Sequence, residues 1–277
     1  MLVLVGSGFV LGTVALTVLS YHLARWLAAN EPEGHTKDLA SSVLFRVSAL
    51  HGLILALVFA QELFEYQQLD TEIVLETNAV ADVFFDAGRY GTDAAAAIQP
   101  ALQDYVDIVV DGEWVALART GQLDPAAWSR WDEAYGTILD LQPTTARQES
   151  LREHMLAQIH VVARTRDLRE SHAGSPIRRM FWFAAIGGVV LIATAYHTFP
   201  PTRHNVTLLC VFGAFTGLIL FFIYALANPY RDPGALEPVA YEQLASELAN
   251  AMTEGTGPLQ PGSVDDQPAR EAASTVR

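Results

Sequence analysis

The chain has 277 residues, of which 51% are hydrophobic and 17% are charged, and its formal net charge at pH 7 is -14. Soluble domains usually carry about 25% charged residues, so apolar and acidic residues must lie in separate segments here, as in membrane spans joined to an acidic part. The acidic balance argues against nucleic acid as a partner, because phosphates need basic patches. The single cysteine, Cys210, excludes a disulfide framework within the chain.

Four segments are long and apolar enough to cross a bilayer, which takes about 20 mainly apolar residues. The first lacks a basic leader and a small-residue cleavage site, so we interpret it as a retained helix and not as a signal peptide. The second is interrupted by Arg46 and His51. The four segments cover residues 2–21, 42–64, 180–199 and 206–227.

The stretch between the second and third spans has the apolar spacing of helices, and no long part of it shows the alternation of apolar and polar residues typical of a strand. We expect the helix of the second span to continue to Tyr90. Thr92 is a candidate N-cap for the next helix, and Asp124-Pro125 is typical of an N-cap followed by the first helical residue. The further helices are expected over 93–119, 124–141 and 144–171.

The predicted fold class is therefore all-α, with four transmembrane helices and a helical soluble insert between spans two and three. Residues 1–66 hold the first two spans, 67–179 the soluble insert and 180–227 the last two spans. Residues 228–252 form an amphipathic segment. Residues 253–277 lack aromatic and long apolar groups, so we expect a disordered tail.

An even number of spans places both termini and the soluble insert on one side of the membrane. More arginines lie near the membrane on that side than on the other, so the positive-inside rule favours a cytoplasmic insert in a multi-pass protein of the plasma membrane. The residues compared are Arg164, Arg166, Arg169, Arg178, Arg179 and Arg231 on that side, and Arg25, Lys37, Arg46 and Arg203 on the other.

The sequence lacks the short motifs of common enzymes. It contains no G-x-S-x-G, no phosphate-binding G-x-x-x-x-G-K-[ST], no H-E-x-x-H and no C-x-x-C. We therefore expect no catalytic residue, no metal site and no cofactor.

Four glutamates follow the second span on one helical face. At 100° per residue, Glu62, Glu65, Glu72 and Glu76 fall within roughly 80° of one another. A carboxylate where a span leaves the membrane needs water, a cation or a partner. One interpretation is that several copies surround an axis, so that Glu62 and Glu65 form a ring of negative charge at a pore mouth. The candidates for the pore lining are then His51, Leu55, Val58, Phe59, Glu62 and Glu65.

The other interpretation is a structural clamp within one subunit. The helix expected over 144–171 carries Arg164, Arg166 and Arg169, which are candidate ion-pair partners for the glutamates. The sequence leaves the ring and the clamp open. It also leaves open whether the pairs Gly8/Gly12 and Gly213/Gly217 join helices within one bundle or between subunits.

The order of several segments resembles the bacterial bestrophin-like domain family of four-span membrane proteins. The segments are LFRVSALHGLILALVFAQ, LFEYQQLDTEIVLETNAVADVF, DGEWVALA, RTRDLRESHAGSPIRRMFW and ANPYRDPGALEPVAYEQL. The resemblance covers about residues 1–248 and implies a four-span helical protein with a helical insert. A more distant kinship to bestrophins, which are pentameric ion channels, implies that the second span lines a pore. Arg231 stands where the calcium clasp of animal bestrophins has an uncharged residue.

Together these observations lead us to expect a homo-oligomeric membrane protein that conducts small inorganic ions, cations in preference to anions. Its partners would be the lipid bilayer, further copies of itself and the ions. The alternative is a non-conducting membrane-anchored scaffold or signalling protein whose soluble helices bind a partner. We do not expect an enzyme.

Overall fold

The computed structural model describes residues 1–28, 34–173 and 178–254. Within these ranges the regular structure is entirely helical and contains no strand, which confirms the all-α class. The tail expected to be disordered lies outside the described residues from 255 onward. The elements are α1 (Leu2–Leu27), α2 (Gly34–Tyr90), α3 (Thr92–Ile108), the π-helical η1 (Val109–Glu113), α4 (Trp114–Thr120), α5 (Pro125–Asp140), α6 (Ala146–Ala173), α7 (Arg178–Ala195), the 3-10 helix η2 (Tyr196–Thr198), α8 (Arg203–Leu226) and α9 (Val239–Glu254).

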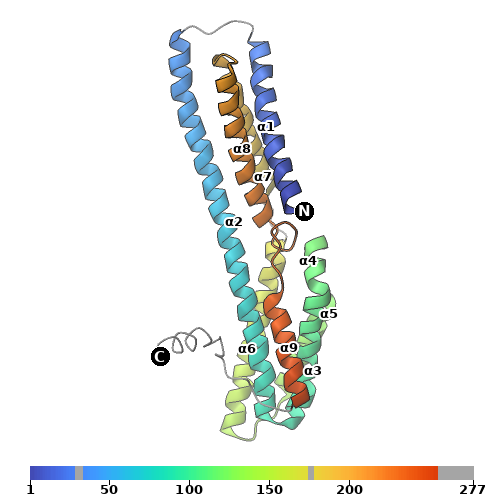
Figure 1. The fold of residues 1–277 in the computed structure, drawn as a ribbon. Helices are drawn as coiled ribbons and strands as arrows, with labels where there is room; N and C mark the ends of the chain where they lie inside the picture. Colours follow the sequence, from blue (N-terminus) through green and yellow to red (C-terminus); the bar gives the residue numbers. More distant parts are fainter. Residues whose placement is uncertain (29–33, 174–177, 255–277) are drawn as a thin grey trace, which may run out of the picture.

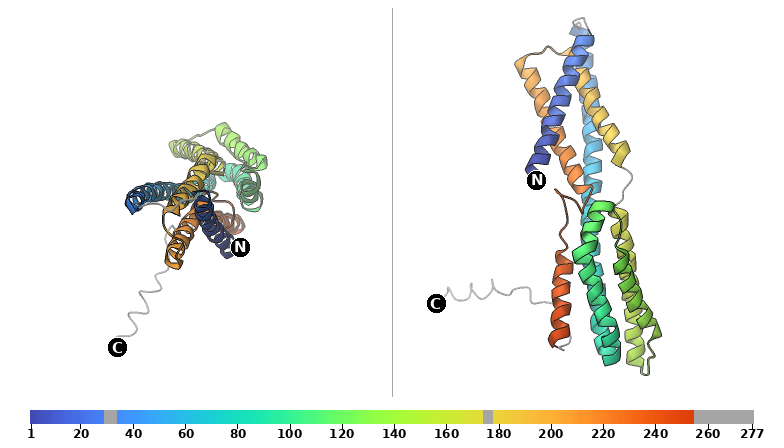
Figure 2. Two further views of the ribbon diagram at one scale, coloured as in Figure 1. Left: turned by 90° about the horizontal axis from the view of Figure 1, so that it is seen from above. Right: turned by 90° about the vertical axis from the view of Figure 1, so that its right-hand side faces the viewer.

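The molecule is a long rod made of two bundles placed end to end (Figures 1 and 2). One bundle contains α1, α7, α8 and the first part of α2. The other contains α3 to α6, α9 and the second part of α2. Helix α2 has 57 residues and runs through both bundles. At 1.5 Å per residue it is about 85 Å long, so it is the axis that joins them.

The first bundle has the dimensions of a membrane domain. Four of the described helices are long and apolar enough to cross a membrane, as the sequence predicted. Their outward side chains are large and apolar, for example Leu11, Phe45, Phe183 and Phe215, all well exposed in the isolated chain. Lipid tails would cover such a surface, so we call this bundle the membrane half.

Helices α1 and α8 pack closely in the membrane half because α8 presents glycine at the contact. A Cβ added at Gly217 would lie 2.9 Å from the Cα of Val10, and one added at Gly213 would lie 3.0 Å from the Cα of Val14. Small residues allow this approach of two backbones in lipid. Gly213 and Gly217 therefore join helices of one subunit, while a Cβ at Gly8 would meet nothing within 4 Å.

The second bundle, here called the soluble half, has a hydrophobic core to which α2, α3, α5, α6 and α9 all contribute. Asp124 caps α5, because its side chain accepts a hydrogen bond from Ala126 N, and Pro125 is the first helical residue; both predictions are confirmed. The N-cap of α3 is Gly91 instead of Thr92. The helix predicted over 93–119 is interrupted by η1, whose wider turn brings Glu113 into the core.

Candidate functional site

One face of α2 packs against its own subunit throughout the membrane half. His51 and Leu55 are only 7% and 5% exposed. Val58 and Phe59 are half-buried, and the ring of Phe59 contacts Phe222 of α8. Their own subunit thus covers His51 and Leu55 in a single copy, and the place of these four residues in a pore lining stays a prediction.

The two glutamates at the end of the second span are half-buried on the same side of α2. Glu65 accepts a hydrogen bond of 2.7 Å from Gln61, which lies one turn earlier and is exposed. Glu62 and Glu65 thus sit at the border between the covered and uncovered faces of α2. Their place in a pore lining stays a prediction.

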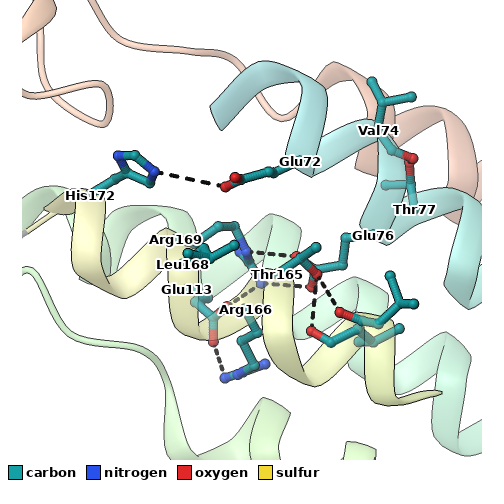
Figure 3. Close-up of polar contacts among 12 residues, drawn as sticks. Glu72, Val74, Glu76, Thr77, Glu113, Thr165, Arg166, Leu168, Arg169 and His172 are labelled. Atoms are coloured by element: carbon teal, nitrogen blue, oxygen red, sulfur yellow. Dashed lines mark hydrogen bonds and ion pairs between the residues drawn. The ribbon is translucent and has the colours of Figure 1, made fainter. Parts of the chain in front are cut away.

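The soluble half contains a cluster of four fully buried charged side chains: Glu76 of α2, Glu113 of η1, and Arg166 and Arg169 of α6 (Figure 3). Arg169 Nε lies 3.0 Å from Glu76 Oε2, and Arg169 Nη2 lies 2.9 Å from Glu113 Oε1. Arg166 Nη2 donates to Glu113 Oε2. We call these four residues the charge cluster; its two carboxylates balance its two guanidinium groups.

Aromatic rings enclose the two guanidinium groups. Arg166 lies over the rings of Tyr105 and Trp128, with its Cζ 5.5 and 5.1 Å from their centroids. Arg169 lies over Trp114 and Tyr241, at 5.8 and 5.4 Å. At these distances the electron-rich ring faces attract a cation. The rings thus exclude water from the guanidinium groups and partly replace the stabilisation that water would give to their positive charge.

Hydrogen bonds join the cluster to a neighbouring side chain and to the backbone of Asp124. The hydroxyl of Tyr105 donates to Glu76 Oε1. The amide of Asp124 donates to Glu113 Oε2 at 3.0 Å, and Arg166 Nη2 donates to the carbonyl of Asp124 at 2.8 Å. Both the amide and the carbonyl of Asp124, at the start of α5, are therefore hydrogen-bonded to the cluster.

Burial changes the protonation behaviour of this region. It raises the pKa of Tyr105 and Tyr241, so both remain neutral hydroxyls at physiological pH. Burial also raises the pKa of Glu113, against the opposite effect of Arg169 and Arg166. Burial is the largest single effect on Arg169 and acts to lower its pKa, but the electrostatic effects of Glu76, Tyr241, Tyr105 and Glu113 together outweigh it, so the pKa rises. Arg169 therefore stays charged at physiological pH.

The glutamate row divides between two surroundings. Glu72 and Glu76 turn toward α6: Glu72 Oε2 lies 3.8 Å from Nε2 of His172, and Glu76 joins the charge cluster (Figure 3). Among the candidate arginines, Arg169 contacts Glu76 and Arg166 contacts Glu113. Arg164 is exposed and takes no part in the cluster.

Sequence reasoning did not single out Glu113. It lies in the stretch DGEWVALA, beside Trp114, and its burial depends on the π-helical turn. The one available signal was an acidic residue next to a tryptophan in an otherwise apolar helical pattern. Among the described residues no group of three or more histidine, cysteine or acidic side chains has the arrangement of a metal site.

The fold and these contacts define a class: a helical membrane protein with four apolar helices and a helical soluble half held by buried charges. A family model described as Bestrophin-like domain matches residues 11–241. This stretch is most of the chain and contains the whole charge cluster, so the chain belongs to the bestrophin-like family, as its segment order indicated. Comparison with curated proteins and with solved structures gives no match.

Proposed function

We propose that the protein is a homo-oligomer that conducts small inorganic ions through the membrane, with α2 of each copy beside the path. One observation carries the proposal: α2 continues from the membrane half into the soluble half, and one of its faces is left uncovered by its own subunit along this course. A helix that spans both halves with a free face is suited to surround a common axis. Membership of the bestrophin-like family supports this arrangement.

The uncovered face of α2 changes in character along its length. Leu50, Leu53 and Leu57 are 61%, 56% and 63% exposed. Gln61 lies one turn further on and Gln68 about two turns after it, both exposed on the same face. Phe64 and Leu75, 62% and 51% exposed, also lie there. At 100° per residue these seven side chains fall within roughly 80°. Around an axis they would give rings of apolar side chains, suited to a constriction, with rings of amides between them that can contact water.

A preference for cations follows from the acidic groups that flank this face. Glu62 and Glu65 stand where α2 leaves the membrane half, and Gln61 of the uncovered face donates to Glu65. The chain as a whole has a formal net charge of -14. Rings of carboxylate at a mouth with apolar walls concentrate cations there.

The location we propose is the plasma membrane, with the soluble half and both termini in the cytoplasm. The distribution of arginine between the two sides supports this orientation. Cysteine accessibility tests it: a cysteine introduced at Asp132, exposed on α5, should react with an impermeant reagent only after the cells are opened.

The experiment on conduction uses the full chain reconstituted in lipid vesicles. The double variant Glu62→Gln/Glu65→Gln should lower the ratio of cation to anion permeability, while Asp132→Asn, on the exposed side of α5, should leave it unchanged. Equal permeability ratios for all three proteins would refute the role of the two glutamates.

The number of subunits in mild detergent tests the assembly itself. A ring of several copies supports a path along α2. A monomer or dimer without ion flux would refute conduction and favour the membrane-anchored scaffold, in which the charge cluster serves only to hold the soluble half in shape.

A further inference from the structure

A pocket of about 390 Å³ lies between α2 and α8 in the membrane half. Its volume is in the range of small-molecule sites, about 300 to 1,000 Å³. Three aromatic side chains contribute to its wall: Phe59 of α2, and Phe212 and Phe215 of α8. Three polar side chains also border it: Ser48, His51 and Thr216. A mainly apolar wall with a few polar groups is the usual composition of a ligand site.

The imidazole of His51 is buried in this wall without a hydrogen bond for one of its nitrogens. Its side chain belongs to a residue that is 7% exposed, and its Nε2 has no partner among the described residues. Buried polar atoms in proteins are nearly always hydrogen-bonded. An orphan nitrogen beside a pocket therefore indicates a partner that comes from outside the chain.

The fold makes room for this histidine at a specific place on α7. A Cβ added at Gly188 would lie 2.2 Å from His51 Nδ1, a distance that no side chain tolerates. The ring thus occupies space that only a glycine leaves free. Such a fit holds the imidazole in the wall of the pocket.

The lining also indicates what kind of molecule fits. Phenylalanine rings favour a flat ring, which stacks on them or meets their edges. A plain hydrocarbon chain would leave Nε2 of His51 without a partner, whereas a molecule with an oxygen would satisfy it. That oxygen accepts from Nε2 when the ring nitrogen carries the proton, and a hydroxyl donates to Nε2 in the other tautomer.

We propose that the pocket lined by His51 binds a membrane-dissolved ring compound carrying a carbonyl or hydroxyl oxygen. This chemistry is shared by lipid quinones and by phenolic lipids. The pocket is lined by α2 and α8 of a single copy, and α7 contacts the ring of His51, so the inference goes beyond ion conduction and stands without it. Binding requires no redox step by the protein.

Three probes of similar apolar length test the proposal on the full chain in mild detergent. Decylubiquinone represents the quinones, nonylphenol the phenolic lipids, and decylbenzene a ring without oxygen. Binding is measured by titration calorimetry, with correction for partition into micelles. At least one oxygen-bearing probe should bind about tenfold or more tightly than decylbenzene, and the tighter of the two identifies the source.

Two variants and a control locate the site. His51→Phe keeps an aromatic ring and removes the nitrogens, so it should weaken the tighter probe about tenfold, the loss of one hydrogen bond. Gly52→Leu should abolish binding, because Gly52 borders the pocket and a Cβ there meets nothing within 4 Å. His22→Phe, on the exposed side of α1, should bind as the parent does.

Two results would overturn the proposal. One is decylbenzene binding as tightly as both oxygen-bearing probes, which would make the pocket a place for any apolar molecule. The other is unchanged binding in Gly52→Leu, which would place the probe elsewhere. Circular dichroism of each variant checks the fold. If His51→Phe does not fold, Gly52→Leu, which adds a side chain to open space, decides.

Discussion

Replacing Arg169 with methionine tests whether the charge cluster holds the soluble half together. The substitution keeps a long apolar side chain but leaves Glu76 fully buried without its cation, and Glu113 with Arg166 alone. Removing one partner of a buried ion pair costs about 3–5 kcal/mol, because a charge stays behind in an apolar place. We expect a loss of this size in the free energy of unfolding.

The measurement is denaturant unfolding of the full chain in mild detergent, followed by tryptophan fluorescence, since Trp114 contacts Arg169. The control is Arg164→Met on the same helix, where the side chain is exposed and the change should stay within about 0.5 kcal/mol. Adding Glu76→Gln to Arg169→Met should recover part of the loss, because it removes the stranded charge. Equal stability of the two methionine variants, or no recovery in the double variant, would refute the reasoning.

Three further predictions concern stability. Gly217→Val should lower the midpoint of thermal unfolding, because the added side chain overpacks α1 against α8 at a cost of about 1–3 kcal/mol. Gly8→Val should leave the midpoint unchanged. Equal midpoints for the two variants would contradict the close contact. Gly121 follows α4 with a φ of 71°, so Gly121→Ala should lower the free energy of unfolding in denaturant by about 1–2 kcal/mol. Gly136 lies inside α5 with open space around it, so Gly136→Ala should leave this free energy unchanged or raise it. Burial raises the pKa of three tyrosines of the soluble half above the ordinary value of about 10, which the unfolded chain keeps. Above about pH 10 the unfolded state therefore binds fewer protons than the folded state, and these three groups lower the free energy of unfolding by about 4 kcal/mol per pH unit. A free energy of unfolding that stays constant between about pH 9 and 11 would contradict this prediction. The tyrosines are Tyr105, Tyr230 and Tyr241.

The main features of the fold follow from local pattern. Long apolar runs predict the four spans, and the absence of a break after the second span predicts its continuation to Tyr90, where α2 ends. Asp124-Pro125 predicts the start of α5 from local geometry alone, because Asp caps the first turn and Pro fits the first helical position. The interruption at η1 is different, because no residue of 109–113 forbids an ordinary helix. It arises where Glu113 meets Arg166, a contact far away in the sequence.

The candidate site shows the limit of helical periodicity. Spacing places His51, Leu55 and the glutamates on one face of α2, but it does not say what covers that face. The structure covers it with α7 and α8 near His51 and with α6 near Glu76. The face open to other molecules is a different one, centred roughly 100° around α2 from the glutamates, and its leucines and glutamines look ordinary in the sequence. Only the packing of distant helices separates the two cases.

Because α2 is one unbroken helix, the charge cluster has an effect well beyond its own surroundings. From Glu76 back to Leu57 the helix makes about five turns, close to 30 Å. An α-helix resists twisting, so a contact that prevents rotation of α2 about its long axis at one end limits its rotation along the whole length. The buried ion pairs of the soluble half thus help to fix the direction in which the leucines of the membrane half point. Loosening Glu76 from Arg169 would remove this constraint on the rotation of α2 and leave only its packing against α7 and α8 to hold the leucines in place.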